Sequence, residues 1–152
     1  MSTAAPALRC QLLPLKGEQL LLPSTAIAEI VRYSALEPVE GAPPWLLGRL
    51  TWRDRPIAVV SFEAACDEGV PVDDRQSKIV VLNAPGGHAQ LSFFGLVVQG
   101  MPQLLQVTED NLAVIEHETE LHPLMHCHVV VSGETAVIPD LDVLEERLLA
   151  LG

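Results

Sequence analysis

Short apolar runs, each ended by a turn-forming cluster, recur along almost the whole chain and limit what it can fold into. The turn signals follow one another about every 8–12 residues, which leaves room for strands but not for a series of long helices. The clearest pair of runs is Leu46 to Trp52 and Ile57 to Val60, with the polar turn Arg53-Asp54-Arg55 between them. Two β-rich runs joined by a short turn predict a hairpin. Many short strands with regular turns predict a β-barrel or sandwich and argue against a fold of βαβ units.

Further runs of the same kind predict strands along the rest of the chain. Arg9 to Leu15 and Gln19 to Leu22 lie on either side of Lys16-Gly17-Glu18, which predicts a second hairpin that Pro23 ends. The other segments expected to be extended are 33–39, 78–83, 89–98, 103–107, 111–116, 125–131 and 135–138, separated by loops over 67–76 and 85–88 and by one helical turn over 62–66.

Two helices are predicted within this series of strands. Ser24 is a good N-cap for a short helix over 25–31, in which apolar residues recur at spacings of three and four. Asp140 is placed to cap a second helix over 141–151, and Gly152 lies where a C-cap belongs. Four leucines line one face of this second helix: Leu141, Leu144, Leu148 and Leu151. The expected fold class is therefore mainly β, with short helices and a C-terminal helix.

The length and charge of the chain exclude several classes of partner. Its 152 residues fit one domain, or two small lobes that share a core. With 9 basic and 20 acidic residues the formal net charge is −11, so the surface repels phosphate groups. Nucleic acid and anionic membrane surfaces are therefore not expected as partners.

The cysteines and the N-terminal residues indicate a cytoplasmic protein. Cys10, Cys66 and Cys127 are odd in number, widely spaced and free of any CxxC pair, as expected of reduced thiols. The first residues lack the basic start and apolar core of a signal peptide. No apolar run approaches the ~18–20 residues that span a bilayer, so no direct membrane insertion is expected. Residues 1–8 are small and unpatterned, which predicts a flexible tail.

A histidine-rich segment near the C-terminal end is the candidate for a metal site. If 125–131 is a strand, His126 and His128 share one face and Cys127 points away. His117 and His122 belong to the same cluster, and Glu116, Glu118 or Glu120 could complete a site. The spacing matches no zinc pattern, and a polar strand face or loop explains the same residues. The alternative function kept open is a small β-barrel protein that binds a metal or ligand through the region from His117 to His128.

The sequence gives little support for catalysis. Ser61 and Ser132 lack the Gly-x-Ser-x-Gly turn that exposes a nucleophile. Gly86-Gly87 is not followed by the Lys-Ser or Lys-Thr of a phosphate loop. A hydrolase whose triad is assembled from distant residues is the weakest hypothesis. The chain is therefore not expected to be an enzyme.

Landmarks along nearly the whole chain resemble, in order, those of CheW-like domains, the adaptor modules of bacterial chemosensory arrays. The stretch from Gly48 to Asp54 is similar to the family's Gly-x-x-x-x-Arg-Gly element, with Arg53 on the arginine. The other landmarks are Ala28-Glu29-Ile30 beside the family's V-x-E-I, Pro43 before Leu46-Leu47-Gly48, the strand Ile57 to Phe62, Phe94 to Val98 beside its Gly-L-x-V strand, and Ile138 to Asp142 beside its I-L-D-x-D entry to a terminal helix.

The departures from this pattern are typical of a divergent branch. Asp54, Ala58, Ser61 and Gln99 stand where the family has Gly, Pro, Asp and Asp. With these departures the chain is similar to a CheW-like protein of the pilus-linked Chp chemosensory system.

The resemblance implies both a fold and a function. The fold is two intertwined SH3-like β-barrel lobes with a hydrophobic groove between them, over residues 9–152 as a single domain. The function is that of an adaptor that couples the cytoplasmic tips of methyl-accepting chemoreceptors to the regulatory domain of a CheA-type histidine kinase, here in control of type IV pilus motility. No catalysis and no cofactor are implied.

The resemblance also assigns residues to the partner-binding surface. Glu29 and Arg53 would form an ion pair that supports the interface region, whereas the pattern alone favours an exposed helix Glu and an exposed turn Arg. Four further residues would lie near the receptor-contacting groove: Ile27, Gly48, Gly95 and Leu104. Gly48 is expected where two backbones approach closely or where φ is positive.

Overall fold

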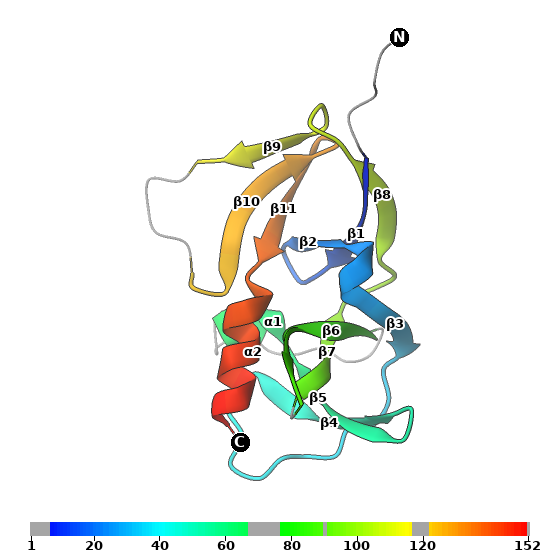
Figure 1. The fold of residues 1–152 in the computed structure, drawn as a ribbon, viewed down its shortest axis with the longest axis vertical. Coiled ribbons are helices and arrows are strands. Elements are labelled where there is room, and N and C mark those ends of the chain that lie inside the picture. The colour runs from blue at the N-terminus through cyan, green and yellow to red at the C-terminus, as the bar shows by residue number, and fades with distance from the viewer. Residues whose placement is uncertain (1–6, 67–76, 90, 117–121, 152) are drawn as a thin grey trace.

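The computed structural model describes residues 7–66, 77–89, 91–116 and 122–151, which form two lobes that are each built on one curled sheet (Figure 1). The first lobe holds a six-stranded sheet in the order β8-β1-β2-β11-β10-β9. Its strands are β1 (Leu8–Pro14), β2 (Gln19–Pro23), β8 (Gln103–Val107), β9 (Leu112–Ile115), β10 (Met125–Val131) and β11 (Glu134–Pro139). This lobe is therefore made from both the beginning and the end of the chain.

The second lobe is made from the middle of the chain. It holds a five-stranded sheet in the order β3-β6-β7-β5-β4. Its strands are β3 (Ile27–Arg32), β4 (Leu46–Trp52), β5 (Arg55–Val60), β6 (Lys78–His88) and β7 (Leu91–Val98). Each sheet contains one parallel pair, β2 with β11 and β5 with β7. The two intertwined lobes confirm the mainly β fold class expected from the sequence.

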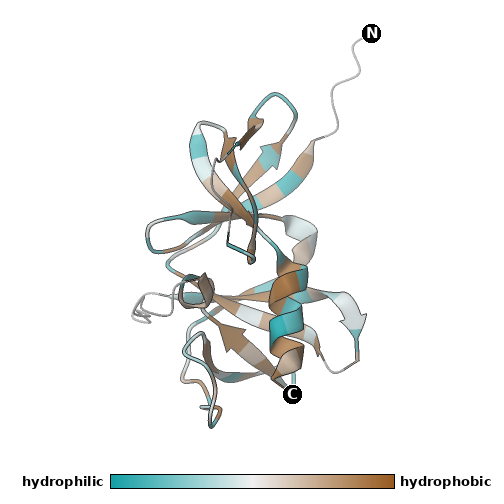
Figure 2. Cartoon of the chain, turned by 90° about the vertical axis from the view of Figure 1, so that its left-hand side faces the viewer, coloured by the Kyte–Doolittle hydropathy of each residue, from teal (hydrophilic) through white to brown (hydrophobic). Residues whose placement is uncertain are grey.

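Buried side chains form a central core between the lobes, one smaller cluster inside the first lobe and two inside the second. On β6, Val80 and Leu82 belong to the central core, whereas Ile79 and Val81 lie inside the second lobe. A strand that is buried on both faces is apolar at every position, which explains the continuous run of the sequence here. Figure 2 shows apolar bands on the strands of both lobes and on the C-terminal helix.

The prediction of a helix over 25–31 is wrong. A short 3-10 turn, η1 (Ser24–Ala26), is followed at once by β3, which pairs with β6. Ile30 packs against the central core and Val31 packs inside the second lobe, so neighbouring side chains point to opposite faces, as in a strand. Ile and Val are β-branched and favour strands, and pairing with the buried β6 decides the outcome. The Ser24 hydroxyl makes no capping hydrogen bond.

The C-terminal helix α2 (Leu141–Ala150) and the helical turn α1 (Phe62–Cys66) are present as predicted. The Asp140 carboxylate accepts a hydrogen bond from the Val143 amide at 3.2 Å, which caps α2. Leu144 and Leu148 are buried, but Leu151 lies beyond the helix and is 49% exposed, so it does not belong to the buried face. Among the described residues, no helix is long and apolar enough to cross a membrane.

The turn predicted over 85–88 is replaced by an extension of β6, which runs on to His88 with an irregular register after Asn83. This end of the strand is held against α2 by Glu145, a buried residue of the helix. The Glu145 carboxylate accepts a hydrogen bond from the Gly86 amide at 2.8 Å, and its second oxygen lies 3.7 Å from His88 Nε2. The loop expected over 67–76 and the C-cap at Gly152 lie outside the described residues.

Candidate docking surface

Glu29 joins the two edge strands of the second-lobe sheet. Its Oε1 atom accepts a hydrogen bond from the indole Nε1 of Trp52 at 3.1 Å and another from Nη2 of Arg53 at 3.2 Å. Glu29 lies on β3 and Trp52 on β4, which are at opposite ends of the strand order. The carboxylate therefore closes the curled sheet into a barrel-like lobe. We call Glu29, Trp52 and Arg53 the closure cluster.

The aromatic ring of Trp52 connects the closure cluster to the interior of the second lobe. The Arg53 guanidinium lies over the indole, 4.5 Å from its centroid, and the Phe93 ring packs against it with centroids 4.8 Å apart. Trp52 is buried, while the side chains of Arg53 and Glu29 are 68% and 42% exposed. An ion pair this exposed contributes less than about 1 kcal/mol by itself. The buried indole is therefore the part of the cluster that most affects stability.

The β4–β5 turn presents Arg53 in a left-handed backbone conformation. Arg53 has φ 48° and Asp54 has φ 63°, and β5 already begins at Arg55, so the loop has two residues and not the three expected. Hairpin loops of this kind favour Gly or Asn, because a side chain at positive φ crowds the backbone. Asp54 stands where the family element has Gly and keeps the positive φ that Gly would adopt freely.

We expect Asp54→Gly to raise the free energy of unfolding by about 1 kcal/mol, because glycine at positive φ carries no Cβ penalty. For a chain of this size the gain corresponds to a rise of about 2–4 °C in Tm, measurable by scanning calorimetry. Asp110→Gly is the matched control, since Asp110 also lies in an exposed turn but is not among the residues with positive φ. The control is expected to lose stability, and a loss in both variants would contradict the turn geometry.

Gly48 allows the chain segment before β4 to lie against that strand. A Cβ built on Gly48, which has φ 151°, would lie 2.7 Å from the carbonyl oxygen of Glu37 and 2.8 Å from Cβ of Leu36. The neighbouring Arg49 and Glu37 exchange two backbone hydrogen bonds, of 2.8 and 2.9 Å. The close approach and positive φ expected of Gly48 are therefore both present.

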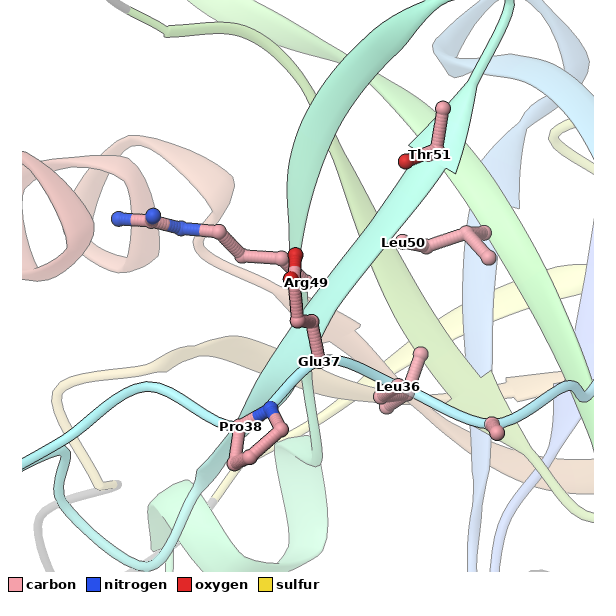
Figure 3. Close-up of a pocket in the computed structure, with 7 residues that line it drawn as sticks. Leu36, Glu37, Pro38, Arg49, Leu50 and Thr51 are labelled. Atoms are coloured by element: carbon pink, nitrogen blue, oxygen red, sulfur yellow. The ribbon is translucent and has the colours of Figure 1, made fainter.

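A shallow hollow of about 550 Å³ opens where the segment from Ala35 to Pro38 crosses the strand from Arg49 to Thr51 (Figure 3). In this view the side chain of Arg49 extends toward α2, away from those of Leu36 and Leu50.

The other residues assigned by resemblance are distributed over both lobes. Gly95 is buried in β7, where a Cβ would lie 2.8 Å from Cγ2 of Ile79 and 3.1 Å from Cγ2 of Val59. Ile27 is half-buried at the start of β3 and packs against the central core. Leu104 is 62% exposed on β8 of the first lobe. The structure therefore brings together only Glu29 and Arg53, and a partner-binding role for all six residues stays a prediction.

Sequence reasoning missed Trp52 and Phe93 as members of the site. The signal for Trp52 was present in the sequence, because the apolar residues Leu50 and Trp52 alternate with the polar residues Arg49 and Thr51. Phe93 carries no comparable signal, since it reaches Trp52 only through the pairing of β7 with β5.

The histidine segment is only partly described. His126 is exposed on β10, and Cys127 points to the core of the first lobe. His122 Nδ1 accepts a hydrogen bond from the Leu124 amide at 3.1 Å, and burial and the charge of Arg147 lower the pKa of this imidazole. Within the described ranges, no group of three His, Cys, Asp or Glu could hold a metal ion. The remaining candidate ligands, His117, Glu118 and Glu120, lie outside those ranges.

The three cysteines are poorly suited to act as nucleophiles. Burial raises the pKa of Cys10 and Cys127. The pKa of the Cys66 thiol is raised to about 12, first by burial and then by the negative charge of Glu18. All three are therefore protonated at neutral pH, whereas the reactive form of cysteine is the thiolate.

Comparison with known proteins identifies the domain type. The family model described as the CheW-like domain matches residues 9–148. No curated protein matches the sequence significantly. Among solved structures, the fold is similar to that of the scaffolding protein TtCheW from Thermoanaerobacter tengcongensis, with a TM-score of 0.77 at 16% sequence identity. The match covers 91% of this chain and 92% of that one.

Proposed function

The chain belongs to the CheW-like domain family, whose members are scaffold adaptors and not enzymes, and from this membership we propose which partners it joins. In the proposal it couples the cytoplasmic tips of methyl-accepting chemoreceptors to the regulatory domain of a CheA-type histidine kinase. It acts in the cytoplasm, and its two lobes work as one domain over residues 9–152. The observation that carries the proposal is the family match across nearly all of both lobes.

Features of the chain itself support this role. The two lobes share the central core, so they form one rigid support on which two partners can be held in a fixed relation. The ion pair between Glu29 and Arg53 implied by the resemblance is present at 3.2 Å, and Arg53 is exposed above the buried Trp52. Interfaces are enriched in arginine and in aromatic residues, which supports the closure cluster as part of a docking surface.

The proposal predicts that the kinase regulatory domain from the same organism binds the chain saturably, at micromolar or tighter affinity. In the Arg53→Glu variant the dissociation constant is expected to rise about tenfold. The new carboxylate repels Glu29, and the guanidinium that lies over Trp52 is lost. Isothermal titration calorimetry measures both constants. Arg32→Glu is the matched control, since Arg32 lies three residues after Glu29 on β3 and its side chain points to the opposite face.

Equal weakening by Arg53→Glu and Arg32→Glu would mean that net charge, and not the closure cluster, governs binding. Absence of binding to the kinase domain and to receptor-tip fragments would contradict the adaptor proposal as a whole.

We also propose that the array served is one that controls type IV pilus motility, on the basis of the departures at Asp54, Ala58, Ser61 and Gln99. Titration against the regulatory domains of the flagellar and the pilus-linked kinases of one organism distinguishes the two pathways. At least tenfold tighter binding to the pilus-linked kinase is expected, and the reverse preference would contradict this assignment.

A further inference from the structure

A groove of about 1190 Å³ lies between α2 and the outer face of the second-lobe sheet. This volume exceeds the roughly 300–1,000 Å³ of a site for a small molecule, so the groove is large enough for side chains of a protein segment. It includes neither Glu29 nor Arg53, and so it lies beyond the surface proposed above. The residues that line the groove include Arg49, Arg55, Ala58, Ser92, Leu149 and Leu151.

The groove exists because α2 covers only part of the sheet. The helix packs on β6, the second strand in the order β3-β6-β7-β5-β4. Strands are spaced about 4.8 Å apart, so β4 lies three strand spacings, roughly 14 Å, from β6 when measured along the curled sheet. Packed helices lie about 8–10 Å apart. One further helix therefore fits beside α2, over β5 and β4, where Ala58 offers a small side chain and Leu151 is half exposed.

The edge of the sheet at this point is not open to an added strand. The backbone of Glu37 is already bonded to Arg49 on β4 at 2.8 and 2.9 Å. A partner in the groove must therefore pack on the face of the sheet with its side chains, as a helix does.

The charge of the groove is opposite to that of the protein. The chain has a formal net charge of −11, yet two of its nine cationic residues, Arg49 and Arg55, line this one groove. Both are exposed, and neither is ion-paired within the described part of the chain. The side chain of Arg49 extends toward α2 (Figure 3), whose residues Leu149 and Leu151 also line the groove.

We propose that this groove docks an amphipathic helix of a partner protein, with an apolar stripe against Ala58 and Leu149 and acidic side chains beside Arg49 and Arg55. The helix lies next to α2 and completes the layer that covers the second-lobe sheet. The partner is therefore recognised by an acidic border along an apolar helical face.

The test uses a fluorescein-labelled 16-residue helical peptide with leucines at i, i+3, i+4 and i+7 and glutamates flanking them, and the same peptide with lysines in place of glutamates. Fluorescence anisotropy with the full chain measures binding, and amide chemical shifts locate it. We expect saturable binding of the acidic peptide only, with the shifts confined to β4, β5, β7 and the end of α2. The double variant Arg49→Glu/Arg55→Glu is expected to weaken binding of the acidic peptide at least tenfold. Ser92→Trp places a large side chain in the groove from an exposed position and is expected to weaken binding by at least the same factor.

The double variant Arg9→Glu/Lys16→Glu, an equal charge change at two exposed residues of the first lobe, is the control and is expected to leave binding unchanged. Circular dichroism verifies that each variant is folded. Equal binding of the two peptides, no binding, or shifts located at Glu29 and Arg53 would overturn the proposal. A dimer in sedimentation equilibrium that the double variant abolishes would also overturn it, because the occupant would then be a second copy. Since the kinase titration depends on Arg53 and this test on Arg49 and Arg55, the two proposals fail separately.

Discussion

Replacing Gly48 with alanine is expected to lower the free energy of unfolding by about 3 kcal/mol, as the combined result of crowding and a positive φ. The atoms that a Cβ would meet are the Glu37 carbonyl oxygen at 2.7 Å and Cβ of Leu36 at 2.8 Å, and neither belongs to the end of a flexible side chain. The backbone must therefore move, and the hydrogen bonds between Glu37 and Arg49 must lengthen. Urea unfolding gives the free energy, and calorimetry should show Tm lower by roughly 6–12 °C.

Gly41→Ala separates the two causes of this loss. Gly41 also has a positive φ, 75°, and it precedes the same strand, but a Cβ there meets no atom within 4 Å. This control isolates the conformational penalty, which is about 1–2 kcal/mol. If Gly48→Ala is no more destabilising than Gly41→Ala, the close approach of the two backbones is not what requires glycine at position 48.

Trp52→Ala is expected to be the most destabilising single change in the closure cluster, by about 4 kcal/mol, because it removes a large buried aromatic side chain. The change deletes the ring that packs against Phe93 and carries Arg53, together with the donor to Glu29. It therefore opens the second lobe at the junction of β3 and β4. Chemical denaturation measures the loss, and hydrogen exchange should show increased opening of these two strands.

Trp52→Phe distinguishes the ring from the hydrogen bond. Phenylalanine keeps an aromatic surface between Phe93 and Arg53 but cannot donate to Glu29. Hydrogen bonds to charged groups contribute about 1.5–3 kcal/mol, and partial exposure of Glu29 places the expected loss near the lower value. A loss in Trp52→Phe as large as that in Trp52→Ala would show that the hydrogen bond, and not packing, closes the sheet.

The sequence predicts those elements whose own residues decide their structure. The run from Ile79 to Leu82 is apolar at every position because β6 is buried on both faces there, and α2 has both a leucine face and its own capping residue, Asp140. The family resemblance marks Gly48 as a position of close approach, and a Cβ there would lie 2.7 Å from the Glu37 carbonyl oxygen. For β6 and α2 the constraint is therefore visible in the residues of the element itself, whereas the neighbours of Gly48 are Leu36 and Glu37 from an earlier segment.

The failures have a different physical origin. The segment 25–31 has apolar spacings compatible with a helix, and only its pairing with β6 makes it a strand. Glu145 is buried in the helix face because the Gly86 amide comes to it from a distant strand. Likewise, Trp52 joins Glu29 only when the sheet curls until its two edges meet. Partners far apart along the chain decide these features, and a local pattern does not contain them.

The division of the first lobe between both ends of the chain has a consequence for how the protein is made on the ribosome. The β1–β2 hairpin emerges first, but its sheet partners β8 and β11 belong to the last third of the chain, where Leu20 pairs with Val137. The second lobe is continuous in sequence, so its strands can find one another while synthesis proceeds. The early hairpin, with its leucines exposed, has to wait until β8 and β11 have been synthesised. This makes it the segment with the greatest need of chaperone protection, and the place where truncated chains are expected to aggregate.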